Sequence, residues 1–370
     1  MEYDMLKQLI SQFIRKGSAV EDEFNQIALT LFAYQYENNQ PFRKYCRKRR
    51  ISPATVSHYL QIPPVPIGAF KQAALSCCPP EEAQAVFMTS GTTNPELRGK
   101  NYHRDLEVYD LSMREHFKSY ILPDVDKVKM AILFPTEAEL PNSSLAHYLH
   151  LGLQTFGKEG SDYMLSSQGL ESEKLIAFLR DSEQNGEPVL VIGATFSFIH
   201  FLDECLGKGT RFQLPEGSRV MDTGGAKGRS REVDPEDLRS QLCQLFSIPS
   251  FACINMYGMS ELSSQFYDGN LRDHVLGNQP ITYSKKAPHW VRTVIFDPAT
   301  MQPKENGEKG IIVHYDLANL NSVLAIMTED LGLSVDDGGF LLLGRAAGSE
   351  AKGCSLAVEQ FLAARSEISR

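Results

Sequence analysis

Apolar residues at helical spacing mark the first 60 residues of the chain. Between residues 20 and 39 they recur at the i, i+3, i+4 spacing of an amphipathic helix. They are Phe24, Ile27, Ala28, Leu31 and Phe32. Prolines then interrupt the pattern in QIPPVPIGAFK, residues 61–71, and because consecutive prolines forbid an α-helix, an extended connector is expected there. Residues 1–75 are therefore predicted to form a helical N-terminal region and linker.

From about residue 125 short apolar runs alternate with amphipathic ones. The short runs predict strands at 127–136, 188–196, 218–225 and 251–258, and the amphipathic runs predict helices at 144–157, 170–186, 197–209 and 234–248. The last helix carries two start signals, Asp234 as N-cap and Pro235 at the first helical position. This alternation predicts an α/β fold with a mostly parallel, helix-covered sheet, in which ligands bind at the carboxyl ends of the strands.

Beyond about residue 280 the helical spacing disappears and strand-like runs dominate. Residues 289–318 contain two such runs around a turn rich in proline and glycine, which is the pattern of a β-hairpin, and further strands are predicted in 322–332 and 339–345. We expect this β-rich part to form a smaller subdomain packed on the parallel sheet. The predicted organisation is an N-terminal region over 1–75, a core over 76–343 and a short C-terminal tail over 344–370.

The balance of charge argues against a nucleic-acid partner. The chain carries a formal net charge of −9, whereas nucleic-acid phosphates are held mainly by clustered lysine and arginine. One basic run, FRKYCRKRR at residues 42–50, is interpreted as the solvated face of a helix, with partner docking as the less favoured alternative.

The length of the apolar runs and the placement of cysteines indicate a cytoplasmic protein. No apolar run approaches the roughly 20 residues of a membrane-spanning helix, and the first residues lack the apolar core of a signal peptide. The seven cysteines are too few and too irregularly spaced for a disulfide framework. His103, His147 and His150 lack a third ligand at metal spacing and are interpreted as ordinary polar residues.

A loop of small hydroxyl residues is the first candidate for chemistry. TSGTT, residues 89–93, follows the apolar run AVFM directly, and small residues around a glycine allow backbone N–H groups to approach phosphate oxygens closely. The loop lacks the G-x-x-x-x-G-K-[ST] pattern of a P-loop. Taken alone, it is equally compatible with a surface turn.

Three further motifs follow this loop, namely YGMSE at residues 257–261, TEDLG at 328–332 and GR at 344–345. In this order the set resembles the core motifs of adenylate-forming enzymes. Longer segments, among them DTGGAKGRSREV, NMYGMSELSSQFYD and GRAAGSEAKGCSLA, are similar to the acyl-protein synthetase family of the LuxE type, known from bacterial bioluminescence. The resemblance runs from about residue 60 to the end. It implies the large domain of an adenylate-forming enzyme with a much shortened C-terminal segment.

The resemblance also implies where the phosphates and a metal ion bind. In adenylate-forming enzymes the loop rich in threonine, serine and glycine holds the β- and γ-phosphates of ATP. The matching residues are Thr89, Ser90, Gly91, Thr92 and Thr93. Glu261 would hold Mg²⁺, which accepts one or two protein carboxylates together with phosphates, and Arg345 would neutralise charge near the ribose or the α-phosphate. Asn94 stands where the family usually has glycine, and the customary lysine further on is absent.

The nucleoside would be held by residues from three segments. Gly224 and Gly225 would lie against the adenine, where a Cβ would collide, with a plain strand-to-loop turn as the alternative. Asp330 would accept hydrogen bonds from both ribose hydroxyls. The residues of YGMSE that would lie beside the nucleotide are Tyr257, Gly258 and Ser260.

The tail carries the candidate nucleophile. Full-length adenylate-forming ligases continue after the GR motif into a mobile domain with a catalytic lysine, whereas only residues 346–370 follow here. An acyl adenylate is a mixed anhydride with a good leaving group, so the thiolate of Cys354 is expected to capture the acyl group as a thioester. Lys352 would favour the thiolate form, and Gly353 would let the tail fold back. The alternative is a buried cysteine at the start of a C-terminal helix.

Together these features predict an ATP-dependent acyl-protein synthetase. It would activate a carboxylic acid, expected to be a fatty acid, as acyl-AMP, hold it on Cys354 and pass it to a partner such as an acyl reductase. Phe196 and Phe198 lie where related enzymes line the acyl pocket, with ordinary core positions as the alternative. Two other functions stay open: an acyl- or aryl-CoA ligase of the phenylacetate-activating kind, or a loader of a carrier protein; and a non-catalytic nucleotide-binding regulator, which Asn94 and the missing lysine would fit.

Overall fold

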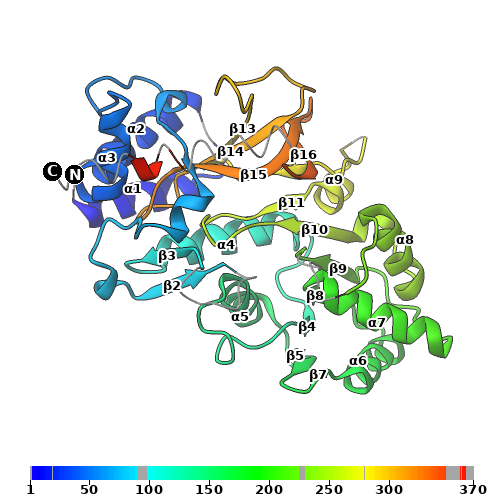
Figure 1. The fold of residues 1–370 in the computed structure, drawn as a ribbon. Helices are drawn as coiled ribbons and strands as arrows, with labels where there is room; N and C mark the ends of the chain where they lie inside the picture. Colours follow the sequence, from blue (N-terminus) through cyan, green and yellow to red (C-terminus); the bar gives the residue numbers. More distant parts are fainter. Residues whose placement is uncertain are drawn as a thin grey trace.

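The computed structural model describes residues 2–18, 20–89, 98–224, 230–278, 280–346, 359 and 361–363. Two groups of elements stand out along the chain. N-terminal helices pack with antiparallel strands in one half, and parallel strands pack between helices in the other (Figure 1). In these residues no helix combines the length and the apolar character that crossing a membrane requires.

The predicted parallel half is confirmed. Its strands are β4 (Lys129–Leu133), β5 (Asp162–Tyr163), β8 (Val189–Gly193), β9 (Arg219–Asp222) and β10 (Cys253–Tyr257). They pair in parallel in the order β10-β9-β8-β4-β5. The helices are α4 (Glu107–Tyr120), α5 (Ser144–Phe156), α6 (Ser172–Asn185), α7 (Thr195–Lys208) and α8 (Pro235–Phe246). Asp234 caps α8 as predicted, because its side chain accepts hydrogen bonds from the backbone N–H groups of Glu236 and Asp237.

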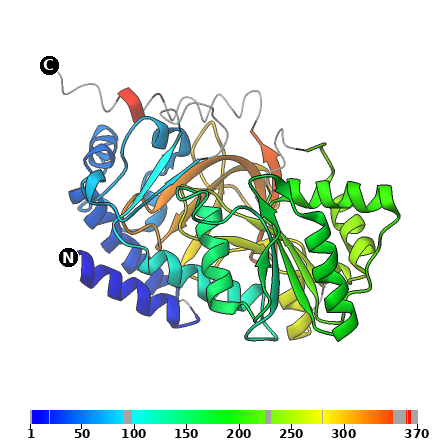
Figure 2. The same cartoon turned by 90° about the horizontal axis from the view of Figure 1, so that it is seen from below.

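Side chains that alternate along these strands build two apolar layers. Ala131 and Val191 face a core formed with α6, α7 and α8. Met130 and Ile192, their neighbours in the chain, face a second core formed with α4, α5 and α9 (Asn270–Leu276). Figure 2 shows the helices on both sides of these strands. Coverage of both faces explains why the strand sequences are continuously apolar.

The β-rich part differs from expectation in how it joins the sheet. It comprises β11 (Phe266–Asp268), β12 (Lys285–Lys286), β13 (Val291–Phe296), β14 (Gly310–Asp316), β15 (Ala325–Ser334) and β16 (Phe340–Arg345). The hairpin of β13 and β14 is confirmed. However, all these strands continue one twelve-stranded sheet in the described chain, in the order β13-β14-β15-β16-β12-β11-β10, so the prediction that they pack on the parallel sheet is wrong. The junction consists of β11 and β12, which are too short to show a periodic signal in the sequence.

The N-terminal region is helical as predicted, with α1 (Tyr3–Arg15), α2 (Glu21–Asn38) and α3 (Gln40–Lys48). The connector is partly ordered into secondary structure: η1 (Tyr59–Gln61), β1 (Val65–Pro66) and η2 (Ile67–Lys71). Strand β1 pairs in parallel with β15. Phe13 of α1 and Leu31 of α2 belong to the same apolar core as Ile312 and Ala325 of the sheet. The residues before position 75 therefore share a hydrophobic core with the sheet and do not form a separate core of their own.

The remaining elements are short. They are η3 (Pro80–Glu82), β2 (Ala85–Met88), β3 (Lys100–His103), β6 (Leu165–Ser166), β7 (Gly169–Leu170) and η5 (Ser250–Ala252). Strands β2 and β3 form an antiparallel pair of their own and carry the two ends of the threonine- and glycine-rich loop.

Gln35 fastens α2 to the turn between β14 and β15. Its side chain is fully buried, and its amide N–H group donates to the Asn319 carbonyl oxygen at 2.7 Å. Its amide oxygen accepts from the Leu324 N–H at 2.9 Å. One side chain thus satisfies two backbone groups that water cannot reach, which fixes the helix relative to the sheet.

Replacing Gln35 with alanine leaves both backbone groups buried and unpaired, so we expect the free energy of unfolding to fall by about 2–4 kcal/mol. Urea unfolding followed by circular dichroism measures the change. Gln26 lies exposed on the same helix, and Gln26→Ala should stay within about 0.5 kcal/mol of the native chain. Equal effects of the two substitutions would show that Gln35 does not fasten α2.

Candidate active site

The threonine- and glycine-rich loop begins and ends at one point of the fold. The Thr89 N–H donates to the Gly99 carbonyl oxygen at 3.0 Å, and the Gly99 N–H donates to the Thr89 hydroxyl at 3.0 Å. A Cβ added to Gly99 would come to 3.1 Å from Thr89 Cγ2 and 3.5 Å from Glu261 Oε1. The base of the loop therefore lies directly against Glu261. The other predicted phosphate-binding residues lie outside the described residues; they are Ser90, Gly91, Thr92 and Thr93.

The YGMSE segment is bonded to the same hairpin. Tyr257 is the last residue of β10, and Gly258 begins the segment that follows. The Ser260 hydroxyl donates to the Met88 carbonyl oxygen at 3.3 Å, and the Asn101 amide donates to the Ser260 carbonyl oxygen at 3.0 Å. Two motifs separated by more than 150 positions in the sequence thus meet at one place.

Glu261 is a buried carboxyl group with no cationic partner at ion-pair distance among the residues that the structure describes. Its side chain is almost inaccessible to solvent, and burial raises its pKa to about 7, although the more distant charges of Lys71 and Arg345 oppose this shift. An unpaired buried carboxylate is costly. A hard cation with oxygen ligands, such as Mg²⁺, would remove that cost.

Tyr257, Asp330 and Arg345 converge from three strands. The Tyr257 hydroxyl donates to Asp330 Oδ2 at 2.8 Å, and Arg345 Nε lies 3.0 Å from Asp330 Oδ1. Arg345 also pairs with Glu329 at 2.9 Å. Asp330 and Arg345 face each other in the β15–β16 register. Burial, together with the Asp330 carboxylate, raises the pKa of Tyr257 well above its ordinary value, so its hydroxyl remains a donor.

Gly224 follows β9 in a left-handed conformation with φ +70°. Its carbonyl oxygen accepts from the Thr195 N–H at the start of α7, at 3.2 Å. No described atom lies within 4 Å of a Cβ built on Gly224. The glycine is therefore favoured by its backbone conformation. Its predicted companion, Gly225, lies outside the described residues.

Beneath Gly224 lies a buried polar network that the sequence motifs did not predict. Asp222 Oδ2 accepts from the Thr195 hydroxyl and from the Asn255 amide, both at 2.7 Å. Lys285 donates to the Asn255 carbonyl oxygen at 2.9 Å and to Asp268 Oδ1 at 2.7 Å. Burial raises the pKa of Asp222. Polar residues inside the apolar strands RVMD and CINMY were the available signal for this network.

Two further predictions can be compared with the structure. Phe198 is fully buried in the core beneath α7, so it does not line an open acid pocket, and Phe196 is half-buried. His147, interpreted from the sequence as an ordinary polar residue, lies between two carboxylates. Its ring nitrogens are 2.8 Å from Asp110 Oδ1 and 2.6 Å from Glu137 Oε1. Burial alone would lower its pKa, but the two carboxylates outweigh burial and raise it.

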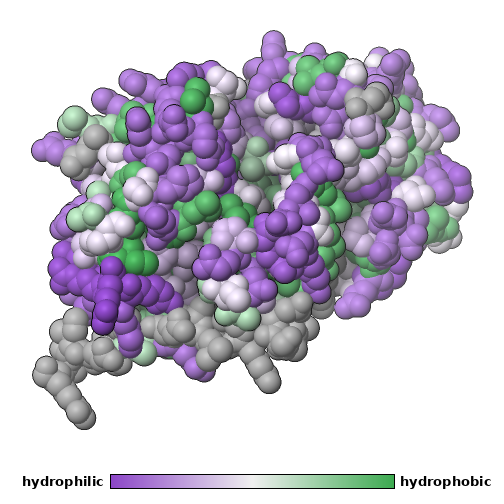
Figure 3. Space-filling model, turned by 90° about the horizontal axis from the view of Figure 1, so that it is seen from above, coloured by the Kyte–Doolittle hydropathy of each residue, from purple (hydrophilic) through white to green (hydrophobic). Residues whose placement is uncertain are grey.

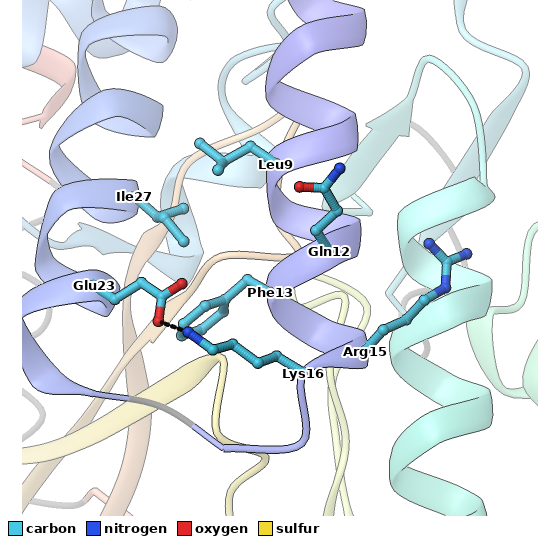
Figure 4. A pocket seen from close by; sticks show the side chains of 7 residues that line it. All are labelled: Leu9, Gln12, Phe13, Arg15, Lys16, Glu23 and Ile27. Atoms are coloured by element: carbon cyan, nitrogen blue, oxygen red, sulfur yellow. Dashed lines mark hydrogen bonds and ion pairs between the residues drawn. The ribbon is translucent and has the colours of Figure 1, made fainter.

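Two surface hollows lie at the N-terminal helices, away from these motifs. One, of about 440 Å³, lies between α1 and α2 (Figure 4). Leu9, Phe13 and Ile27 form its apolar side, and Lys16 pairs with Glu23 across its rim at 2.6 Å. The other, of about 400 Å³, lies between α1 and the start of α4. Neither is lined by a residue of the motifs predicted to bind the nucleotide.

Known proteins resemble the chain over most of its length. The family model described as "Acyl-protein synthetase, LuxE" matches residues 18–363. A long-chain-fatty-acid–luciferin-component ligase of Vibrio harveyi is 22% identical over 349 residues, which cover 91% of this chain and 87% of that protein. The ligase of the same name from Aliivibrio fischeri is 23% identical over 311 residues, covering 82% and 76%.

Among solved structures, 2-hydroxyisobutyryl-CoA ligase in an open conformation, in complex with 2-HIB-AMP and CoA, superposes with a TM-score of 0.61. The identity is 13%, and the match covers 90% of this chain and 77% of that one. This likeness confirms the predicted fold class, an α/β fold like that of adenylate-forming ligases.

The buried carboxyl of Glu261 makes stability depend on pH. Its pKa rises from 4.5 to about 7 on folding. Its contribution to the free energy of unfolding is therefore fully present below pH 4.5 and declines as pH increases to about 7. The loss amounts to about 3 kcal/mol. We expect the free energy of unfolding of Glu261→Gln, minus that of the native chain, to be larger at pH 8 than at pH 4 by about that amount. Urea unfolding at both pH values without divalent cations measures it.

Glu329→Gln is the matched control, because Glu329 is the neighbouring strand carboxylate with a side chain 44% exposed. Its effect on the free energy of unfolding should be small at both pH values. An effect of Glu261→Gln that is the same at pH 4 and pH 8 would contradict the raised pKa.

Proposed function

Because the chain belongs to the acyl-protein synthetase family, LuxE, we propose that it holds an activated fatty acid as a thioester on Cys354 and delivers it to an acceptor protein. It is an adenylate-forming ligase and activates an acyl group with ATP. The observation that supports the proposal beyond family membership is the buried carboxyl of Glu261 at the base of the threonine- and glycine-rich loop, which has no ion-pair partner among the described residues.

In the first half-reaction, a carboxylate oxygen of the acid attacks the α-phosphorus of ATP and pyrophosphate leaves. Residues 89–93 hold the β- and γ-phosphates, with Thr89 at the fixed base of the loop. Mg²⁺ on Glu261 would neutralise charge on these phosphates. Arg345 contributes further positive charge near the α-phosphate, and Ser260 lies beside the loop. Fixed charges of this kind stabilise the transition state without reorganisation.

The nucleoside is bound on the side of Asp330. Both carboxylate oxygens of Asp330 already have partners, but each oxygen has a second lone pair for a ribose hydroxyl. Tyr257 and Arg345 fix the carboxylate in place before the nucleotide arrives, which limits the entropy lost on binding. Gly224 and Gly225 provide the backbone surface for adenine.

In the second half-reaction, the thiolate of Cys354 attacks the acyl carbonyl carbon. The new C–S bond replaces the C–O bond to the phosphate, and AMP leaves with the bonding electron pair. Lys352 favours the thiolate, whose proton has already passed to solvent. Cys354 and Lys352 lie outside the described residues. The names of the two bacterial relatives support a long-chain fatty acid. The family description supports a protein acceptor, for which an acyl reductase is chemically suited.

The thioester predicts a simple separation of the two half-reactions. Cys354→Ser should leave acid-dependent exchange of pyrophosphate into ATP within about twofold, because acyl-AMP formation does not use the thiol. It should abolish the acyl mass that intact-protein mass spectrometry detects after incubation with ATP and tetradecanoate. Cys243→Ser is the matched control, since Cys243 is half-buried and belongs to none of the motifs. An acyl group on a cysteine other than Cys354 in Cys354→Ser, located by mass spectrometry of peptides, would refute the role of Cys354.

The nucleoside site predicts a second outcome. Asp330→Asn removes the charged acceptor for the ribose hydroxyls, so the KM for ATP should increase about tenfold to a hundredfold. Steady-state pyrophosphate exchange measures it. Glu329→Gln removes the other partner of Arg345 and should change the KM for ATP less than threefold. Equal changes in the two variants would assign the effect to Arg345 instead.

A further inference from the structure

Strand β2 is bonded to the segment that joins β4 to α5, residues 134–143. The Met88 N–H donates to the Asn142 carbonyl oxygen at 2.8 Å. The Met88 carbonyl oxygen accepts from the Ser260 hydroxyl at 3.3 Å. Thr89, the first residue of the threonine- and glycine-rich loop, comes next in the chain. The backbone from which the loop departs is therefore held by two other parts of the fold.

The β4–α5 segment contains a compact turn. The Thr136 N–H and hydroxyl both donate to Glu139 Oε2, at 2.9 and 2.8 Å. The Leu140 N–H donates to the Thr136 carbonyl oxygen at 3.1 Å. Glu137 lies inside this turn, and Asn142 follows it closely in the chain. Because the turn is closed by its own hydrogen bonds, a contact that fixes Glu137 also restricts the position of Asn142.

His147 fastens this turn to the rest of the fold. Its ring nitrogens lie 2.6 Å from Glu137 Oε1 and 2.8 Å from Asp110 Oδ1 on α4. The ring also packs against Phe87 of β2, with centroids 5.5 Å apart, and against Tyr109 of α4 at 5.7 Å. Figure 1 shows β2 and α5 side by side. One side chain thus contacts the turn, helix α4 and the strand that leads into the loop.

Burial distinguishes these contacts from ion pairs at the surface. Hydrophilic residues dominate the face of the molecule in Figure 3, and ion pairs on such a surface are screened by water and salt and contribute little. His147 is only 8% exposed, and the side chains of Asp110 and Glu137 are partly buried. Loss of one partner would therefore leave a charge in a place that water reaches poorly.

The surroundings of the ring favour its charged form. The titratable groups that face it are Asp110 and Tyr109 on α4, Glu137 in the turn, His103 on β3 and His150 on α5. Burial raises the pKa of Tyr109. Burial and the charge of His147 lower the pKa of His103 to about 4, so both of these neighbours are neutral. Although burial opposes the shift, the two carboxylates raise the pKa of His147 above its ordinary value of 6.5.

We propose that His147 is a positioning residue for the phosphate-binding loop, because its ring joins the turn that holds Met88 to helix α4. With this joint intact, the backbone of Met88 and Thr89 has one position relative to Glu261. Small displacements of groups that hold a reacting substrate are costly. The inference rests on the proposed binding of the β- and γ-phosphates by residues 89–93, and it concerns the first half-reaction alone.

The first measurement needs no nucleotide. Amide hydrogen exchange at Met88 should be about tenfold faster or more in His147→Phe and in Glu137→Ala than in the native chain. His147→Phe keeps the aromatic packing but loses both carboxylate contacts, whereas Glu137→Ala keeps the pair of His147 and Asp110. His150→Gln is the matched control, because His150 lies on the same helix, 3.8 Å from Glu137 Oε2, with a side chain 38% exposed. It should leave the exchange rate within about twofold.

The second measurement is the KM for ATP in acid-dependent pyrophosphate exchange. His147→Phe, Glu137→Ala and the double variant should each increase it about threefold to tenfold, and to the same extent, because the two residues act through one contact. The dissociation constant of AMP, measured by calorimetry, should stay within about twofold of the native value, since AMP has no β- or γ-phosphate. A general loss of packing would weaken AMP binding as well and would overturn the inference.

The dependence on pH separates the charge of His147 from its shape. The charged bridge is fully present below pH 6.5 and is lost as pH increases through the raised pKa of His147. The KM for ATP of His147→Phe, divided by that of the native chain at the same pH, should therefore fall as pH increases from about 6 to about 9. A ratio that is the same at every pH would overturn the inference.

Two results would overturn the positioning role and leave the proposed function intact. They are unchanged exchange at Met88, and faster exchange with an unchanged KM for ATP. The loop itself is tested by replacing Thr92 and Thr93 together with valine, which should increase the KM for ATP about tenfold. If that double substitution leaves the KM for ATP unchanged, the proposed phosphate binding by residues 89–93 fails, and the positioning role fails with it.

Discussion

The buried ammonium group of Lys285 holds the junction at which the sheet changes from parallel to antiparallel strands. It binds the Asp268 carboxylate on β11 and the Asn255 carbonyl oxygen on β10 from its own position on β12. A charge that is removed from water is tolerated only with such partners, so three strands have one mutual arrangement. Through Asn255 and Asp222 the same network reaches the start of α7. The carboxyl ends of the parallel strands are thereby fixed relative to β15 and β16, which carry Asp330 and Arg345.

Three buried carboxylates in this region differ in what surrounds them. Asp268 is paired with Lys285 and Arg239 and serves the architecture. Asp330 is held by a hydroxyl and a guanidinium and keeps lone pairs for a ligand. Glu261 has no cation at ion-pair distance among the described residues, and burial raises its pKa. The fold therefore places a buried carboxylate without an ion-pair partner among the described residues beside the loop to which the family resemblance assigns phosphates.

Much of the fold follows from local pattern. The apolar runs of β4, β8, β9 and β10 and the cap at Asp234 are signals within a few residues of the elements they create, and the structure bears them out. The order of the site motifs also predicts that Thr89, Glu261 and Asp330 serve one site, and the structure places Glu261 beside the base of the loop that begins at Thr89. The joining of the two halves depends instead on β11 and β12, whose pairing partners are distant in the chain. The same holds for Lys285 and for the bracket of Asp110 and Glu137 around His147, since contacts of high sequence separation leave no periodic trace.

Helices α1–α3 and strands β13–β15 fill one common apolar core. A crossover near residue 75 with a distant relative would divide that core between two unrelated sets of side chains, and its packing would be lost even if every motif residue were retained. During evolution of this protein, core substitutions before residue 75 are therefore expected to be accompanied by compensating core substitutions after it. For engineers, chimeras built from the family have their tolerated junctions elsewhere.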